Sequence, residues 1–79
     1  MKRKVIEPGH IVLLKELGIR IKKLRTDKNI GYIQMAKDIG LSKNSYNSIE
    51  LGNSYCNFLS ILRIADYHHV SVSTLLSGL

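Results

Sequence analysis

The sequence has few cysteine, proline, tryptophan and acidic residues, and no long apolar run. Its 79 residues include one cysteine, one proline and no tryptophan, and acidic side chains are half as numerous as basic ones. A single cysteine cannot form an internal disulfide, so we expect a cytoplasmic chain that folds by its core alone. The longest apolar run, Ile11 to Leu14, has four residues, whereas a membrane-spanning helix needs about 20. Lys2, Arg3 and Lys4 are not followed by the continuous apolar stretch of a secretory signal.

The charge of the chain is positive and unevenly distributed. Twelve lysines and arginines against six aspartates and glutamates give a net charge of +6. Residues 1–28 contain nine of the basic and three of the acidic side chains, whereas residues 29–79 contain three of each. A basic surplus indicates a polyanionic partner, usually nucleic acid, although charge alone also allows a small basic protein with no such partner.

Apolar residues recur at helical spacing in five segments. A first helix is predicted after a basic tail at residues 1–9, and it ends near Asn29. No segment shows the alternation that is typical of a strand. We therefore predict one all-α domain of five helices over residues 10–79. The four shorter helices are predicted at residues 32–39, at 43–51, from the cap Asn57 to about Tyr67, and after the cap Ser71.

The ends and inner faces of these helices follow from the residue types. Ser42, Asn57 and Ser71 suit N-caps because their side chains accept a hydrogen bond from the first helical turn. Gly40 and Gly52 suit helix C-termini because glycine adopts the left-handed backbone conformation without strain. The residues expected to face the core are Ile11, Leu14, Leu17, Ile21, Leu24, Met35, Ala36, Ile39, Tyr46, Ile49, Phe58, Ile61, Leu62, Ala65, Val72, Leu75 and Leu76.

Residues 32–51 have the pattern of a helix-turn-helix. The small Ala36 allows two short helices to approach closely, Gly40 allows a tight turn, and Tyr46 with Ile49 would pack the second helix against the first. The second helix then exposes a polar face that suits base edges in a DNA major groove. An ordinary antiparallel helix pair with a solvated polar face would also fit. The exposed residues would be Lys43, Asn44, Ser45, Asn47 and Ser48.

Several short motifs occur together in one register along residues 13–77. They are Leu17-Gly18-x-Arg20-Ile21-x-x-Leu24-Arg25, Ala36, Gly40-Leu41-Ser42, Ile49-Glu50-x-Gly52, Ile61-Leu62-x-Ile64-Ala65 and Val70-Ser71-x-x-x-Leu75-Leu76. With these motifs the chain resembles the Cro/cI-type (XRE-like) helix-turn-helix family of phage and bacterial regulators. The resemblance implies a compact, lambda-repressor-like fold of five helices, of which the second and third read DNA.

The resemblance also implies roles for individual residues. Lys43, Asn44, Ser45 and Ser48 occupy positions of base-contacting side chains, with Asn47 nearby; lysine suits guanine O6/N7 and asparagine suits adenine N6/N7. The matching phosphate contacts are Tyr32, Ser42, Asn53 and Ser54. Arg25 and Glu50 match a salt bridge that ties the first helix to the end of the reading helix.

The sequence departs from the family pattern at four positions. Tyr32 and Tyr46 replace a usual glutamine and a usual isoleucine or valine, Cys56 stands at a usual proline, and His68 stands at a usual leucine. We expect His68 to be buried with a lowered pKa and Cys56 to be a small buried residue. The pattern of Cys56 with His10, His68 and His69 does not have the spacing of a zinc site, so no metal or cofactor is predicted.

The function expected from the sequence is that of a DNA-binding transcriptional regulator, in particular a repressor, and not an enzyme. A protein-interaction module or an antitoxin-like protein with the same fold is the alternative. The partners would be double-stranded DNA and a second copy of the chain. The basic tail could contact the minor groove of DNA or could only keep the protein soluble, and both alternatives stay open. For Tyr55, contact with DNA and packing against the protein both stay open. The homodimer would form through Tyr67, Val70, Val72, Leu75, Leu76 and Leu79.

Overall fold

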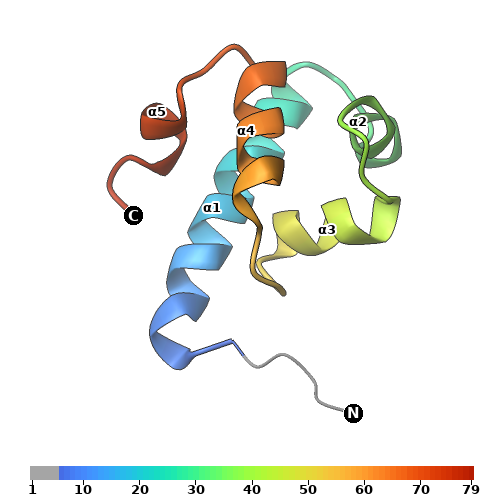
Figure 1. Cartoon of the computed structure of the whole chain (residues 1–79). Coiled ribbons are helices and arrows are strands. Elements are labelled where there is room, and N and C mark those ends of the chain that lie inside the picture. Colours follow the sequence, from blue (N-terminus) through green and yellow to red (C-terminus); the bar gives the residue numbers. More distant parts are fainter. Residues whose placement is uncertain (1–5) are drawn as a thin grey trace.

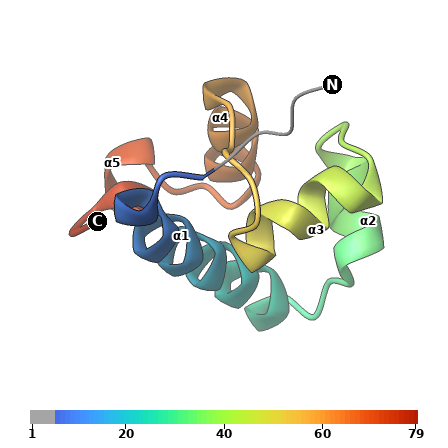
Figure 2. The same ribbon diagram turned by 90° about the horizontal axis from the view of Figure 1, so that it is seen from below.

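The computed structural model describes residues 6–79 and contains five α-helices within that range (Figure 1). The predicted all-α, five-helix class is confirmed, and residues 6–79 contain no strand. In both views α4 lies between α5 on one side of the molecule and α2 on the other (Figures 1 and 2). Lys2, Arg3 and Lys4 of the predicted tail lie outside the described residues. The helices are α1 (Pro8–Asp27), α2 (Tyr32–Asp38), α3 (Lys43–Leu51), α4 (Phe58–Tyr67) and α5 (Val72–Leu76).

Local hydrogen bonds set the starts of the last three helices. Ser42 accepts a hydrogen bond from the backbone N–H of Ser45 at 3.1 Å, and Asn57 accepts one from Ser60 at 2.8 Å. Ser71 does the same for the first turn of α5. Each bond satisfies a donor that the helix itself leaves without a partner. The three predicted N-caps are therefore confirmed.

The start of α1 differs from the prediction. The helix begins at Pro8, inside the segment that was predicted as a tail over residues 1–9. Proline suits the first helical position because its fixed φ fits a helix and its missing N–H would have had no partner there. The backbone N–H of His10 then donates to the carbonyl of Glu7 at 2.8 Å. The tail was therefore predicted too long at its C-terminal end.

One buried cluster connects all five helices. Ile21, Met35, Tyr46 and Ile64 are the largest side chains that are fully enclosed. Three residues that were expected to face this core are exposed instead, namely Ile11 (38%), Phe58 (65%) and Leu62 (42%). The buried residues of the cluster are Leu17, Ile21, Met35, Ala36, Ile39, Tyr46, Ile49, Ile61, Ile64, Ala65 and Leu75.

These three corrections have two physical causes. Ile11 lies in the first turns of α1, and the buried residues of that helix begin only at Leu17. In α4, six of the first eight residues are apolar, so the spacing alone fits more than one inner face. The face that packs inward carries Ser60, Ile61, Ile64 and Ala65, and it leaves Phe58 and Leu62 outside.

The C-terminal segment packs onto the molecule more fully than predicted. Leu75 is buried, and Tyr67, Val70, Val72 and Leu76 are partly buried against the core. Of the six residues predicted as a homodimer surface, only Leu79 is exposed. The Arg20 guanidinium also donates to the carbonyls of Leu75 and Ser77 and so fastens the end of α5 to α1. Leu75 therefore belongs to the core of a single copy, four other residues of the predicted dimer surface are partly covered, and the homodimer stays a prediction.

His68, the residue after α4, is buried although its ring nitrogens have no hydrogen-bond partner among the described residues. It is 5% exposed, and neither ring nitrogen has a hydrogen-bond partner among the described residues. The ring instead meets the edge of the Tyr67 ring, with 5.2 Å between centroids. Burial lowers the pKa of His68, and the positive charge of Lys28 and the neighbouring His69 lower it further. The predicted burial of this histidine is confirmed.

None of the helices between residues 6 and 79 combines the length and the apolar character that crossing a membrane requires.

Candidate nucleic-acid interface

A tight turn joins α2 to α3. Gly40 has φ +77°, a conformation that favours glycine, and the backbone N–H of Leu41 returns to the carbonyl of Ala36 at 2.9 Å. Ala36 itself is 1% exposed, so its small side chain lies inside the bend. The geometry is that of two short helices held together by a glycine turn, as the sequence pattern predicted.

Backbone contact between α1 and α3 holds the second of these helices in place. A Cβ on Gly18 would lie 2.2 Å from the carbonyl oxygen of Glu50 and 2.7 Å from that of Ile49. Gly52, with φ +69°, also lies close against the backbone of α1, because a Cβ there would be 2.8 Å from the Lys15 Cα. Any side chain at these two positions would separate α3 from α1. The position of α3 is therefore set by the fold as a whole.

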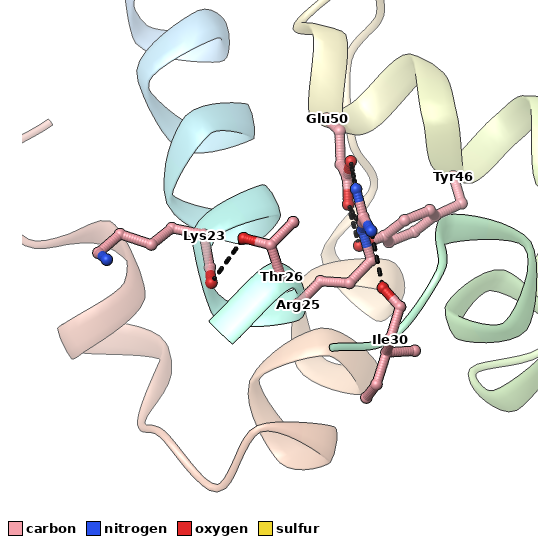
Figure 3. Close-up of polar contacts among 6 residues, drawn as sticks. All are labelled: Lys23, Arg25, Thr26, Ile30, Tyr46 and Glu50. Atoms are coloured by element: carbon pink, nitrogen blue, oxygen red, sulfur yellow. Dashed lines mark hydrogen bonds and ion pairs between the residues drawn. The ribbon is translucent and has the colours of Figure 1, made fainter. Parts of the chain in front are cut away.

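A buried ion pair adds to this attachment (Figure 3). The Arg25 guanidinium donates from Nε to one carboxylate oxygen of Glu50 at 2.6 Å and from Nη2 to the other at 2.9 Å. Its Nη1 donates to the carbonyl of Ile30 at 2.7 Å, just before α2. The hydrogen bond to Glu50 raises the pKa of Arg25 although burial opposes it. The pair joins the end of α1 to the end of α3 and to the loop before α2.

Tyr46 belongs to the same network, a link that the sequence analysis did not identify. Its ring is fully enclosed, and its hydroxyl donates to the Glu50 carboxylate (Figure 3). Burial, followed by the hydrogen bond to Glu50, raises the pKa of Tyr46 well above the usual value of a tyrosine. The carboxylate one helical turn away thus satisfies the hydroxyl that replaces a usual aliphatic residue. A tyrosine followed four residues later by glutamate on one helix is a signal that could have indicated this bond.

The outer side of α3 is open. Seen from below, no other described helix covers α3 (Figure 2). Lys43, Asn44 and Ser45 are exposed, and Asn47 and Ser48 are half-buried. Asn44 and Ser48 are four residues apart and therefore share one face, which Leu51, 50% exposed, continues at the end of the helix. Leu51 was not among the predicted site residues.

A cleft of about 410 Å³ separates α3 from the loop before α4. It brings three of the predicted base-contacting residues (Asn44, Ser45 and Ser48) together with one predicted phosphate contact, Ser54. Lys43 and Asn47 do not line the cleft. Its complete lining is Leu41, Asn44, Ser45, Ser48, Ile49, Ser54, Tyr55, Cys56, Asn57 and Ser60. The walls of the cleft thus combine polar and apolar side chains, and none of these side chains is charged.

The predicted phosphate contacts differ in whether their side chains are free to bind a phosphate. Tyr32 at the start of α2 is 37% exposed, and Asn53 is exposed on the loop after α3. The hydroxyl of Ser42, by contrast, donates to the Ser45 hydroxyl at 2.9 Å while it accepts the Ser45 N–H. Ser42 therefore has no free proton to donate to a phosphate, whereas the Ser45 hydroxyl keeps its own. The available donor lies at Ser45.

Two residues of the cleft lining, Tyr55 and Cys56, contribute to the structure in different ways. The Tyr55 hydroxyl lies 2.7 Å from Nδ1 of His10 and accepts the Glu7 N–H at 3.2 Å, so it ties the loop to the start of α1. Burial raises the pKa of the Cys56 thiol to about 11, which keeps it protonated and unreactive at neutral pH. Within residues 6–79 no three histidine, cysteine or acidic side chains gather as a metal site would require.

Comparison with known proteins identifies the same architecture. The family model of the helix-turn-helix domain matches residues 18–78. The chain is also 32% identical over 63 residues to the HTH-type transcriptional activator BcrR of Enterococcus faecalis. This match covers 80% of the present chain and 31% of that relative, so the chain spans about a third of the relative's length.

Proposed function

The chain belongs to the helix-turn-helix domain family, and from this membership we propose that it is a transcriptional regulator. The family consists of DNA-binding regulators and not of enzymes. In our proposal, α3 recognises specific DNA sequences. The observation that carries the proposal is the arrangement of α3. Its inner side is fixed by Tyr46, Ile49 and Glu50, while its outer side is polar and open. Such a helix can enter a major groove without disturbing the core.

The side chains around the cleft support a division of roles. Asn44, at the centre of the outer face, suits a bidentate contact with adenine, and Ser45 and Ser48 can bond to either kind of base. Lys43 and Asn47, on the other edge of α3, would contact bases or the adjoining backbone. Leu51 continues the face of Asn44 and Ser48, where its apolar surface suits a thymine methyl group.

Phosphate contacts would hold α3 in register. Tyr32 and Asn53 lie at the two ends of the helix-turn-helix unit, which spans about residues 32–51, and Ser54 lies in the cleft. Such contacts position a protein on the duplex without reading its sequence. The positive charge that attracts the duplex comes from residues 1–28, because residues 29–79 have no net charge.

We place repression first as the mode of regulation, because occupation of a promoter by a bound domain is sufficient to block transcription. The relative from Enterococcus faecalis, by contrast, is named as a transcriptional activator. A reporter placed downstream of the bound DNA distinguishes the two modes, since its output falls under repression and rises under activation. We also propose that two copies act together, because one reading helix contacts few base pairs.

One observation supports a second candidate function. The only basic side chain on α3 is Lys43, and the neutral second part of the chain would give a weaker attraction to DNA than a basic one. A protein-interaction module or an antitoxin-like protein would keep this fold and bind mainly to another protein.

Binding measured against salt separates the two candidates. For DNA binding, the logarithm of the affinity falls linearly with the logarithm of the salt concentration, with a slope of about −0.9 per neutralised phosphate. Selection of duplexes from a random pool should then enrich a defined sequence. Absence of salt-sensitive binding to any duplex, together with absence of enrichment, would favour the interaction module.

A further inference from the structure

The hydroxyl of Tyr55 lies where the start of α1 meets the loop before α4. It accepts the backbone N–H of Glu7 at 3.2 Å and lies 2.7 Å from Nδ1 of His10, across 45 residues or more of sequence. The rings of His10 and Tyr55 also meet edge to face, with 5.6 Å between their centroids. In Figure 2 the described residues just before α1 run toward this loop. Three separate contacts therefore fix the position of one hydroxyl group.

The same tyrosine lines the cleft beside α3. Tyr55 is 42% exposed, and it shares the cleft with Asn44 and Ser48 of α3 and with Ser54 of the loop. A duplex whose bases face α3 places its sugar-phosphate backbone at the edge of the groove, and so beside the loop wall of this cleft. A phosphate there finds hydroxyl groups but no cation from the loop, because residues 52–57 contain no basic side chain. His10, at the Tyr55 hydroxyl, can supply that charge.

The protonation state of His10 decides where the hydroxyl proton of Tyr55 points. This proton has no acceptor among the described residues other than Nδ1 of His10, so Tyr55 donates to the neutral imidazole. A protonated imidazole is a donor at both ring nitrogens. Its Nδ1–H then donates to the Tyr55 oxygen, whose two lone pairs accept this bond and the N–H of Glu7. The hydroxyl proton is thereby released to bind an anion.

From these observations we propose that His10 and Tyr55 form a further phosphate-contacting pair, in which protonated His10 supplies the charge and Tyr55 the hydrogen bond. The inference rests on the proposed function, since the phosphate belongs to the DNA that α3 reads. A phosphate close to the ring favours the imidazolium form, so binding of DNA is coupled to uptake of a proton. DNA binding is then stronger in mildly acidic than in mildly alkaline solution, because histidine changes its charge between about pH 5 and 8.

The other titratable and charged groups around His10 do not produce this dependence. Glu7, three residues before His10, is exposed and favours the imidazolium in the free and in the bound protein alike. Lys15 and Glu16 lie more than one turn further along α1, and their charges cancel. On the loop and the first turns of α4, residues 52–62 contain no charged side chain. Burial raises the pKa of Cys56 to about 11, so this thiol is uncharged at neutral pH. The charge that changes at this contact is therefore that of His10.

Matched histidine variants test this assignment. His10→Asn keeps an oxygen that accepts from Tyr55 but cannot take up a proton, and His69→Asn makes the same change at another exposed histidine. On a selected duplex at constant ionic strength, the wild type and His69→Asn should bind roughly tenfold more tightly at about pH 5.5 than at about pH 8. Their salt slope should also be steeper at the acidic pH by about 0.9, the value of one phosphate contact. His10→Asn should show neither change. Circular dichroism at each pH verifies that the compared proteins are folded.

Tyr55→Phe separates a phosphate contact from a purely structural tie. The hydroxyl reaches the phosphate only when His10 is charged, so this variant should lose roughly fivefold in affinity at about pH 5.5 and little at about pH 8. A hydroxyl that merely fixes the loop would cause the same loss at both pH values. Such an equal loss, or a wild-type pH dependence in His10→Asn, would overturn the pair while DNA binding by α3 stands. Absence of DNA binding by the wild type and every variant at both pH values would overturn the proposed function as well.

Discussion

Gly18 of α1 lies against the backbone of Glu50 in α3 so closely that a Cβ would stand 2.2 Å from the Glu50 carbonyl oxygen. The neighbouring atoms belong to the backbone, so no side-chain rotation can relieve the overlap. We expect Gly18→Ala to lower the free energy of unfolding by about 3 kcal/mol or more, because the two helices must separate. Urea unfolding measures this loss. Gly9→Ala is the control, because a Cβ at Gly9 meets nothing within 4 Å; destabilisation of the same size there would contradict the explanation.

The buried pair of Arg25 and Glu50 predicts strong coupling between the two residues. Arg25→Met would leave the Glu50 carboxylate buried with only the Tyr46 hydroxyl, and Glu50→Leu would leave the guanidinium without its acid. Each single change should lower the free energy of unfolding by about 3–5 kcal/mol. The double variant should lose clearly less than the sum, since no unpaired charge remains. A double-mutant cycle gives the coupling, and additive losses would contradict it.

His68 predicts a dependence of stability on pH. Its pKa is lowered in the folded state, chiefly by burial and also by Lys28 and His69. The unfolded chain therefore takes up a proton first, and stability falls as the pH drops through about 6.5. His68→Leu removes this loss and fills the site with an apolar side chain. The Tm of the variant should exceed that of the wild type, by more at about pH 5 than at about pH 7.5.

The matched control for this experiment is the neighbouring histidine. His69 is exposed and has φ +56°, a conformation that asparagine tolerates. His69→Asn should keep most of the pH dependence of the wild type, because the buried ring of His68 is unchanged. Equal Tm values for the wild type and His68→Leu at acidic pH would show that the imidazole is solvated.

Two asparagines distinguish base contacts from phosphate contacts. Asn44→Ala, on the outer face of α3, should weaken binding to the selected sequence by about 1–3 kcal/mol and relax the preference at one base pair. Asn53→Ala, on the loop after α3, should weaken binding to all duplexes alike. Titrations against the selected duplex and its single-base variants measure both effects. The same profile for both variants would contradict these roles.

The helix boundaries could be predicted from the sequence because short-range chemistry decides them. Ser42, Asn57 and Ser71 cap helices through bonds that reach only three residues. Gly40 ends α2 through its own backbone conformation. The family motifs likewise brought Arg25 and Glu50 together, although the two residues are far apart in sequence.

The surface could be predicted less well because it depends on contacts between distant segments. The spacing of apolar residues in α4 did not show that Arg63 and Tyr67 would face α2 and so turn Phe58 outward. Tyr55 and His10 meet across 45 residues, and no local pattern indicates that bond. At Ser42, the residue type was suited to phosphate, but its hydroxyl is used by Ser45.

The residues on the outer and inner sides of α3 have separate roles. Lys43, Asn44 and Ser48 make no side-chain hydrogen bond to any other residue of the described chain, whereas Tyr46, Ile49 and Glu50 hold the helix in place. Exchange of the outer residues therefore leaves the core and the turn unchanged. Duplicated copies of such a gene can diverge toward different DNA targets through a few substitutions, each of them nearly neutral for folding, and so give a set of regulators on one scaffold.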